Sequence, residues 1–457
     1  MIAVRLVFRH CDRVIGEQLQ VLMETVFARD RVDALAREYG VVERARALDV
    51  REFLVALVLT GGTERGGRQY DALRTYIENG AVRVARSAFY SWFNDPLERL
   101  LTTLLEDALA HAHLVEKLLP GILGTVSDWR IVDSTTVKLD DELIAEWPGT
   151  GDYAALKVHK EWSVGTGNLL AFKITPAREH DSPHLVVDER RRGTGLLIDL
   201  GYASLARLAD CERYDVRYVI RLKESWKPRI DRIVRGTVGT DILAKGDFDV
   251  LLEKDIFLHN DRAIDADVTV GRGSAAIKSR LVGVPTPKGY CFFLTNLPRK
   301  THGPLQVGDI YRVRWEVEID NKVDKTGARI DAITARKPVS VRILLLASLL
   351  NSVLARIIVQ REKLAIVKHK AQGTRAPLHP IQVVRAMTMC QRVLLLTLDD
   401  QQSTSSDWSK AMMRIRDLGH DPNWRRRPSV LDTIQGLTGE PQPRRVKGKK
   451  LGTNGAN

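Results

Sequence analysis

Residues Trp129 to Leu139 read WRIVDSTTVKL, a stretch rich in β-branched residues that predicts a strand with Asp133 inside it. Two more strand patterns follow, LKVHKEWSV from Leu156 and LLAFKIT from Leu169. The turn Gly165–Asn168 joins them. Consecutive strands with so short a connection predict an antiparallel hairpin.

Helix and strand patterns alternate after this hairpin. Ser182 followed by proline is typical of a helix N-terminus and predicts a helix over residues 183–192, PHLVVDERRR. The apolar run Leu196–Asp199 predicts a buried strand, residues 203–210 a helix and residues 216–223 a further strand. The order is three strands, helix, strand, helix, strand. It predicts a mixed α/β sheet that resembles the ribonuclease-H-like fold.

The composition of the 457-residue chain narrows its partners. The chain has 70 Lys and Arg residues and 57 Asp and Glu residues, which gives a net charge of +13. This positive charge favours an anionic polymer as the binding partner. The four cysteines are scattered along the chain, so we expect neither a disulfide framework nor a cysteine zinc site. We expect the protein to be located in a reducing cytoplasm. The apolar run Ile343–Ala355 is too short to cross a bilayer, so we expect a buried core helix and no membrane partner.

Five segments follow from the patterns. Residues 1–120 have helical periodicity, and we expect an N-terminal helical DNA-binding domain. Residues 121–223 predict the first part of the ribonuclease-H-like core, and residues 224–300 a β-rich insertion. Residues 301–400 predict the second part of the core with C-terminal helices. Residues 401–457 predict a C-terminal segment that ends in a loose basic tail.

Within the first segment, VRVARSAFYSWFNDP from Val82 to Pro96 mixes arginines with aromatic residues. Such a stretch is consistent with a DNA-contacting helix. It is equally consistent with a core helix that has a solvated basic face. The sequence does not favour one interpretation over the other.

The sharpest chemical pattern is YRVRWEVEIDNKVDKTG, which begins at Tyr311. At 100° per residue, one helix would place Tyr311, Arg314, Glu318 and Lys325 within a narrow arc. Lys322 falls on the same arc, whereas Glu316 and Asp320 fall on the opposite side. An ion-paired surface helix could show the same charges.

Two more acids stand at strand positions. Asp133 lies inside the first predicted strand, and Asp199 ends the fourth. A carboxylate in an apolar strand is costly to bury unless it is paired or binds a metal ion. Taken singly, each could also be an exposed acid at a strand end.

Together these motifs resemble the DDE transposases of the insertion-sequence-four family of bacterial mobile elements. The resemblance covers about residues 120–360 and rests on Asp133-Ser134-Thr135, Asp199-Leu200-Gly201-Tyr202 and the spacing Y-(2)-R-(3)-E-(6)-K. It implies that Asp133, Asp199 and Glu318 are the catalytic residues and hold two Mg²⁺ ions, with Mn²⁺ as an accepted substitute. Carboxylate oxygens suit Mg²⁺, and two such ions stabilise in-line displacement at phosphorus. The DNA-binding side chains expected beside them are Tyr311, Arg314, Lys325 and Lys322.

The resemblance implies a DNA transposase that cleaves strands at the element's ends and transfers the freed 3′-OH into target DNA. Its partners would be double-stranded terminal inverted repeats and target DNA, bound by a homodimer in the cytoplasm at the bacterial nucleoid. Two alternatives stay open. One is a ribonuclease-H-like nuclease that only hydrolyses, and the other is a catalytically silent DNA-binding protein descended from a transposase.

Aromatic residues of the insertion and three histidines are weaker candidates. Related transposases stack an aromatic of the insertion on a flipped base, and Tyr290 is the candidate here, although packing inside the β segment is favoured for it and for the neighbouring aromatics. The other aromatics are Trp226, Phe292 and Phe293. For the histidines we favour structural roles or support of the site, because no third ligand stands at zinc spacing. They are His159, His180 and His184.

Overall fold

We describe the protein from a computed structural model. The description covers residues 16–41, 49–60, 68–80, 84–235, 246–247, 263–287, 289–369, 376–399 and 404–438. The strand pattern FDVLLEKDIFL, from residue 248 to 258, and the end of the basic tail lie outside these ranges.

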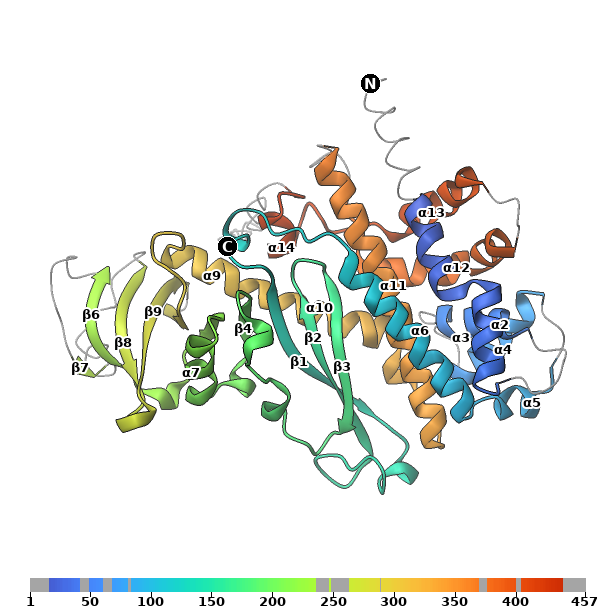
Figure 1. The fold of residues 1–457 in the computed structure, drawn as a ribbon, viewed down its shortest axis with the longest axis horizontal. Coiled ribbons are helices and arrows are strands. Elements are labelled where there is room, and N and C mark those ends of the chain that lie inside the picture. Colours follow the sequence, from blue (N-terminus) through green and yellow to red (C-terminus); the bar gives the residue numbers. More distant parts are fainter. Residues whose placement is uncertain are drawn as a thin grey trace, which may run out of the picture.

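The first five strands form a ribonuclease-H-like sheet in the order β3-β2-β1-β4-β5 (Figure 1). The strand β2 pairs antiparallel with both β1 and β3, whereas β1, β4 and β5 run parallel to one another. The predicted mixed sheet is therefore confirmed. The strand bounds are Trp129–Lys138, Ala155–Ser163, Asn168–Pro176, Gly195–Ile198 and Arg217–Arg221.

The β-rich insertion continues this sheet beyond β5. The strand β10 pairs antiparallel with β5, and β9, β8, β6 and β7 follow in that order, giving one 10-stranded sheet across the described residues. Figure 1 shows β6, β8 and β9 at the opposite end of the molecule from the N-terminal helices. The bounds are Arg229–Arg235 for β6, Gly246–Asp247 for β7, Ile264–Val270 for β8, Ile277–Thr286 for β9 and Gly289–Thr295 for β10.

The prediction of a helix over residues 183–192 is wrong. Only two 3₁₀ turns form there, Ser182–His184 and Glu189–Arg191. Leu185 and Val187 are both buried while Val186 between them is 53% exposed. This alternation has a period of two, as in extended chain, so the contacts of the two buried side chains override the helical N-terminal signal. The next predicted helix does form, as α7 over Leu205–Arg213.

A helical segment covers the other face of the sheet from α7. It begins with α9 (Pro304–Arg312), passes through a 3₁₀ turn (Val313–Trp315) into α10 (Glu316–Lys322), and ends in a π-helical turn (Val323–Gly327). Its apolar residues pack with those of β1, β4 and β5 in one hydrophobic cluster. The apolar residues of α7 pack with the opposite sheet face in a second cluster.

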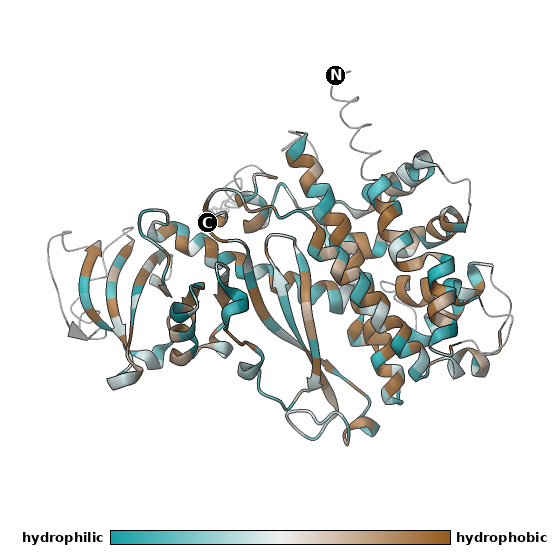
Figure 2. Cartoon of the chain, in the orientation of Figure 1, coloured by the Kyte–Doolittle hydropathy of each residue, from teal (hydrophilic) through white to brown (hydrophobic). Residues whose placement is uncertain are grey.

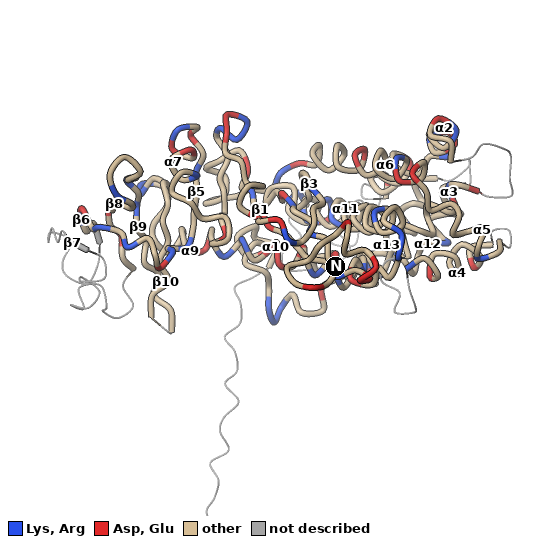
Figure 3. The backbone as a smooth tube through the Cα atoms, turned by 90° about the horizontal axis from the view of Figure 1, so that it is seen from below, with Lys and Arg blue, Asp and Glu red and all other residues tan. Residues whose placement is uncertain are grey.

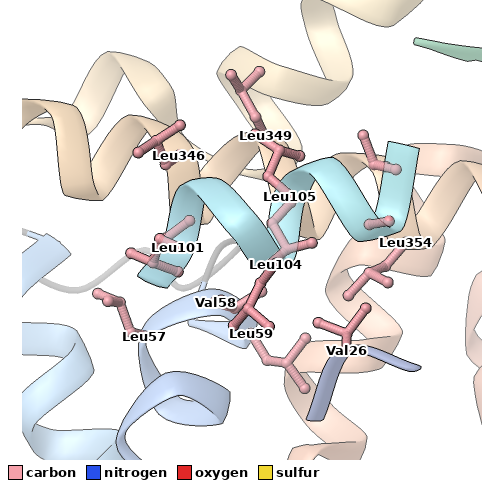
Figure 4. Close-up of a cluster of buried hydrophobic side chains, with 14 of the residues drawn as sticks. Val26, Leu57, Val58, Leu59, Leu101, Leu104, Leu105, Leu346, Leu349 and Leu354 are labelled. Atoms are coloured by element: carbon pink, nitrogen blue, oxygen red, sulfur yellow. The ribbon is translucent and has the colours of Figure 1, made fainter. Parts of the chain in front are cut away.

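The remaining helices surround α11, Pro338–Lys368, as one helical block. Leu101 and Leu105 of α6 lie near Leu346 and Leu349 of α11, and Leu104 lies near Val58 and Leu59 (Figure 4). Helices from both ends of the chain share this core. They are a helix over residues 16–27, α2 (Arg29–Glu38), α3 (Val50–Leu59), α4 (Arg68–Glu78), α5 (Arg86–Ser91), α6 (Asp95–Leu114), α12 (Pro380–Asp399) and α13 (Ser405–Gly419). The short α14 (Val430–Ile434) follows them and packs with the apolar residues of the α9–α10 segment instead.

Among the described helices, α11 and α12 are long and apolar enough to cross a membrane by length and composition alone. The most apolar window of α11 is nevertheless completely buried inside the protein, whereas that of α12 is 39% buried. Figure 2 shows α11 as a largely hydrophobic helix enclosed by its neighbours. The buried core helix predicted from Ile343–Ala355 is therefore confirmed.

The aromatic stretch before Pro96 packs into this block. Phe89 and Phe93 are buried, and the Phe89 ring centroid lies 5.0 Å from that of Phe53. The guanidinium of Arg86 lies over the rings of Tyr70 and Tyr90. These contacts account for the aromatic residues by packing, and DNA contact by this stretch stays a prediction. Its residues 82–83 lie outside the described ranges.

Candidate active site

The three predicted acids lie on three different elements. Asp133 stands within β1, and Asp199 follows the last residue of the adjacent parallel strand β4. The Asp199 carboxylate caps a 3₁₀ turn by accepting a hydrogen bond from the Gly201 amide at 3.1 Å. Glu318 lies on α10, which packs on the same face of the sheet as Asp133. Because β1 and β4 pair in parallel with Ile131 opposite Leu197, the positions two residues further along, Asp133 and Asp199, lie near each other.

Arg314 and Asn321, both from the α9–α10 segment, connect these acids. One guanidinium nitrogen of Arg314 lies 3.6 Å from Asp199 Oδ1, and another lies 3.6 Å from Glu318 Oε1. The Asn321 Nδ2 donates a hydrogen bond to Asp133 Oδ2 at 2.9 Å. Side chains separated by up to 188 positions in the sequence are therefore linked to one another here.

The electrostatics agree with this proximity. Burial raises the pKa of Asp133, and the negative charge of Glu318 adds to that rise. Hydrogen bonds from the Ser134 backbone and from Asn321 act in the opposite direction. Asp199 and Glu318 are more open, each with a side chain 38% exposed. The site thus combines one half-buried carboxylate with two that solvent reaches.

The predicted DNA-contacting side chains are distributed along the same segment. The Tyr311 ring packs 4.9 Å from the Phe293 ring, and burial raises the pKa of its phenol, with the Asp199 charge acting in the same direction. The exposed Lys322 places its ammonium 5.7 Å from the centre of the Trp315 ring. Lys325 is partly exposed in the π-helical turn. Tyr311 and Arg314 therefore lie with the acids, whereas Lys322 and Lys325 follow further along.

The segment is not the single regular helix that the residue spacing predicts. A 3₁₀ turn at Val313–Trp315 tightens it and a π-helical turn at Val323–Gly327 widens it. The turn angle departs from 100° per residue in both places. Arg314 and Glu318 still approach the same acids, but the direction of Lys325 no longer follows from the spacing alone.

Next to Asn321, residues of α10 and of the π-helical turn belong to a buried ionic cluster that the sequence pattern did not reveal. Asp320 and Asp324 both pair with Lys160 of β2, and Asp324 Oδ2 lies 2.8 Å from its Nζ. Arg356 of α11 completes the cluster, 2.5 Å from Asp320 Oδ1. All four side chains are 4% exposed or less. The only sequence signal was a lysine between the apolar positions Val158 and Trp162 of a strand.

A cavity of about 590 Å³ lies between the α9–α10 segment, α11 and the C-terminal residues 421–432, and Tyr311 and Arg314 also line it. Glu316 lines it together with Lys363 and Asp432, whose charged atoms lie 2.6 Å apart. Burial raises the pKa of Glu316 from 4.5 to about 7, and the Asp432 charge adds to the rise while Lys363 opposes it. The separate role expected for Glu316 and Glu318 stays a prediction, and no sequence pattern indicated the pairing of Lys363 with Asp432 beside Glu316.

Glu316→Gln is expected to increase stability at neutral pH. Between about pH 4.5 and 7 the unfolded chain ionises Glu316 first, so the folded state binds more protons and its stability falls as the pH rises. Glutamine removes that loss. We expect the difference in unfolding free energy between variant and wild type to grow over this range to the order of 2 kcal/mol. Urea unfolding at pH 4.5 and pH 8 measures it. The exposed Glu38→Gln is the control, and a pH-independent difference for Glu316→Gln would disprove the effect.

The weaker candidates have structural surroundings. The His159 and His184 rings stack with centroids 3.6 Å apart, and His159 Nε2 lies 2.9 Å from Thr175 Oγ1. Burial lowers the pKa of His159 to about 4. The Tyr290 and Phe292 rings stack at 5.8 Å on β10. Nothing in these contacts tests base stacking by Tyr290, which stays a prediction.

The fold therefore places two carboxylates from adjacent parallel strands on the sheet face that the Glu318 helix covers. The family described as the transposase DDE domain matches residues 125–354, half of the 457 residues. The chain belongs to this family. Its members typically use divalent metal ions to cleave DNA by phosphoryl transfer.

Individual relatives are distant. The chain is 22% identical over 273 residues to the transposase for insertion sequence element IS231E of Bacillus thuringiensis subsp. finitimus, over 50% of this chain and 55% of that protein. It is 34% identical over 85 residues to the putative transposase InsL for insertion sequence element IS186A of Escherichia coli (strain K12), over 18% and 23%. The chain thus spans about half the length of the first relative and less of the second.

Among solved structures, a cryo-EM structure of the piggyBac transposase synaptic complex with hairpin DNA is similar, with a TM-score of 0.45 and 10% identity. The match covers 90% of this chain and 89% of that chain.

Proposed function

We propose that this chain is a DNA transposase of the insertion-sequence-four family. It cleaves DNA strands at the ends of its element with Mg²⁺ and transfers the freed 3′-OH into target DNA. The observation that carries the proposal is the position of Arg314, which contacts Asp199 and Glu318 at 3.6 Å each, on the segment whose Asn321 holds Asp133. Family membership supports the same reaction class.

The donor atoms of the site fit Mg²⁺. Asp133, Asp199 and Glu318 offer only carboxylate oxygens, the ligand type that Mg²⁺ prefers. Within the described residues, no three His, Cys, Asp or Glu side chains lie close enough to share an ion as they stand. The Arg314 guanidinium is the counter-charge of Asp199 and Glu318 instead. Bound divalent ions would take over that role and supply Lewis acidity and a nucleophilic water at phosphorus.

In this proposal each side chain has a defined task. The three acids hold the metal ions, and Arg314, once it no longer neutralises them, grips a backbone phosphate through two N–H groups. Tyr311, Lys322 and Lys325 hold neighbouring phosphates, the lysines as point charges. Figure 3 shows residues of both signs close together around α10 and β1, as a site for metal ions and phosphates requires. Because phosphoryl transfer uses water and then the 3′-OH as nucleophile, no side-chain nucleophile is needed.

A joining assay tests the proposal. The full chain is incubated with Mg²⁺, a labelled duplex that ends in the element's inverted repeat, and a plasmid target. We expect nicks at the repeat and labelled ends covalently joined to the plasmid, with Mn²⁺ also supporting both steps. Nicks without joined product would indicate a hydrolytic nuclease. Binding without any cleavage would indicate a silent DNA-binding protein, and either result would overturn the proposal.

Lys322→Met is expected to weaken DNA binding at low salt and to flatten its salt dependence. Each lost phosphate contact lowers the slope of log K against log salt by about 0.9. Fluorescence anisotropy titrations between about 50 and 200 mM salt measure this slope. Lys410→Met is the matched control, since Lys410 pairs with Asp407 on α13. Equal slopes for Lys322→Met and wild type would remove Lys322 from the phosphate contacts.

The proposal also covers the oligomeric state of the protein on DNA and its location in the cell. Holding two element ends together requires two active sites, so a homodimer forms on the terminal repeats. The chain then works in the cytoplasm at the nucleoid, where its DNA lies. Sedimentation of the chain with and without repeat DNA tests the first part. A complex with one chain for two joined ends would contradict it.

A further inference from the structure

Asn321 connects the helix that carries Glu318 to the strand that carries Asp133. It lies three residues after Glu318, and its Nδ2 donates to Asp133 Oδ2 at 2.9 Å. A carboxylate oxygen only accepts hydrogen bonds when ionised, so the atom facing it is the amide nitrogen. The bond is charge-assisted, a kind stronger than one between neutral groups.

The residue before Asn321 holds the strand next to β1. Asp133 of β1 and Lys160 of β2 are direct partners in the antiparallel register. Asn321 bonds to the first of these partners and Asp320 pairs with the second. Two successive helix residues thus grip two facing strand residues. Any translation or rotation of α10 relative to the sheet breaks at least one of these two contacts. The contacts to β1 and β2 together therefore fix the distance between Glu318 and Asp133.

The second polar atom of the Asn321 side chain does not explain why an amide is present at this position. Its Oδ1 is buried without a hydrogen-bond partner among the described residues. Leaving a buried polar atom unpaired costs about 1–3 kcal/mol, and an apolar residue at this position would avoid the cost. An amide kept under these conditions is better explained by its bond to Asp133 than by folding stability.

We infer that Asn321 is a positioning residue for Asp133: its amide holds one carboxylate oxygen and thereby fixes the orientation in which Asp133 meets a divalent metal ion beside Glu318. The inference rests on the proposed function, in which Asp133 is a metal ligand. Partners that orient metal ligands typically change metal affinity or activity by about 10–100-fold when they are removed.

The test measures metal binding directly. The full chain, bound to duplex DNA of its element's end, is titrated with Mn²⁺, and free Mn²⁺ is counted by electron paramagnetic resonance. Asn321→Leu removes the amide at similar volume, and Asn321→Ala removes it without demanding space. We expect both variants to bind Mn²⁺ about 10–100-fold more weakly than wild type. Thermal unfolding checks that each variant is folded.

Asn351→Leu is the matched control. Asn351 also donates one hydrogen bond from its side-chain amide, to the Val58 carbonyl at 2.9 Å, and also has a buried Oδ1 without a partner among the described residues. It lies in the helical block, so its loss lowers stability without changing Mn²⁺ affinity.

Asp133→Asn in the same titration separates the two claims. Wild-type affinity in both folded Asn321 variants, with weakened binding in Asp133→Asn, would overturn the role of Asn321 and leave the proposed function standing. Unchanged Mn²⁺ binding in Asp133→Asn as well would overturn the proposed function itself.

Discussion

Asp133→Asn, Asp199→Asn and Glu318→Gln are each expected to slow DNA strand cleavage by about 10³-fold or more. A metal site contributes several kcal/mol of charge stabilisation in the transition state, and each 1.36 kcal/mol is a factor of ten. Each substitution keeps the size of the side chain and removes a negative oxygen ligand. Single-turnover cleavage of an end duplex measures the rate, and anisotropy measures DNA affinity, which should change by less than about tenfold.

The control for this prediction comes from the same segment. Glu316→Gln changes an acid only two residues from Glu318, but the charged neighbours of Glu316 are Lys363 and Asp432 and not the other two acids of the site. We expect cleavage at close to the wild-type rate. Cleavage that survives at an undiminished rate in any of the three site variants would remove that residue from the site. A loss in Glu316→Gln equal to that in Glu318→Gln would contradict the assignment of the two sides of the segment.

Lys160→Met is expected to destabilise the folded chain by about 3–5 kcal/mol, the usual cost of removing one partner from a buried ion pair. Lys160 is fully buried, and its pKa is raised because Asp320 and Asp324 outweigh the effect of burial. Without it, two buried carboxylates share Arg356 alone, and one negative charge is left uncompensated. Urea unfolding followed by circular dichroism measures the loss. Because the cluster also anchors α10, cleavage should fall together with stability.

Lys368→Met provides the matched comparison for Lys160→Met. Lys368 also pairs with a carboxylate, Glu116 Oε2 at 2.6 Å, but both side chains are 59% exposed. Solvent screens such a pair, and we expect a loss below about 1 kcal/mol. Equal stability of the two methionine variants would show that the buried cluster does not hold α10 in place.

Much of the fold could be predicted because its signals are local. The strands β1, β2 and β3 follow from β-branched residues and a short turn, and α11 follows from a long apolar run. The helix expected over residues 183–192 failed because Leu185 and Val187 are buried by contacts with distant residues. The pairing of β5 with β10 joins residues about 75 positions apart, so its register could not be read from either strand alone.

In the candidate site, too, the features with a local sequence pattern could be predicted, and those that depend on contacts between distant segments could not. Asp133, Asp199 and Glu318 could be chosen from motif order, and Arg314 from its spacing to Glu318. The link from Asn321 to Asp133 and the pairing of Lys160 with Asp320 depend on how α10 lies on the sheet, which no local pattern determines. The spacing argument assumed a regular α-helix and therefore did not predict the π-helical turn at Val323–Gly327. A single turn with i→i+5 hydrogen bonds leaves no periodic pattern in the sequence.

The most direct test of the account is an experimental structure of the chain bound to its end DNA and Mn²⁺, with the metal located by anomalous scattering. We expect manganese between Asp133, Asp199 and Glu318, with an oxygen of each about 2.0–2.3 Å from an ion, and Arg314 moved from the acids to a DNA phosphate. Manganese bound elsewhere, or Asp133 left outside the coordination of every ion, would contradict it.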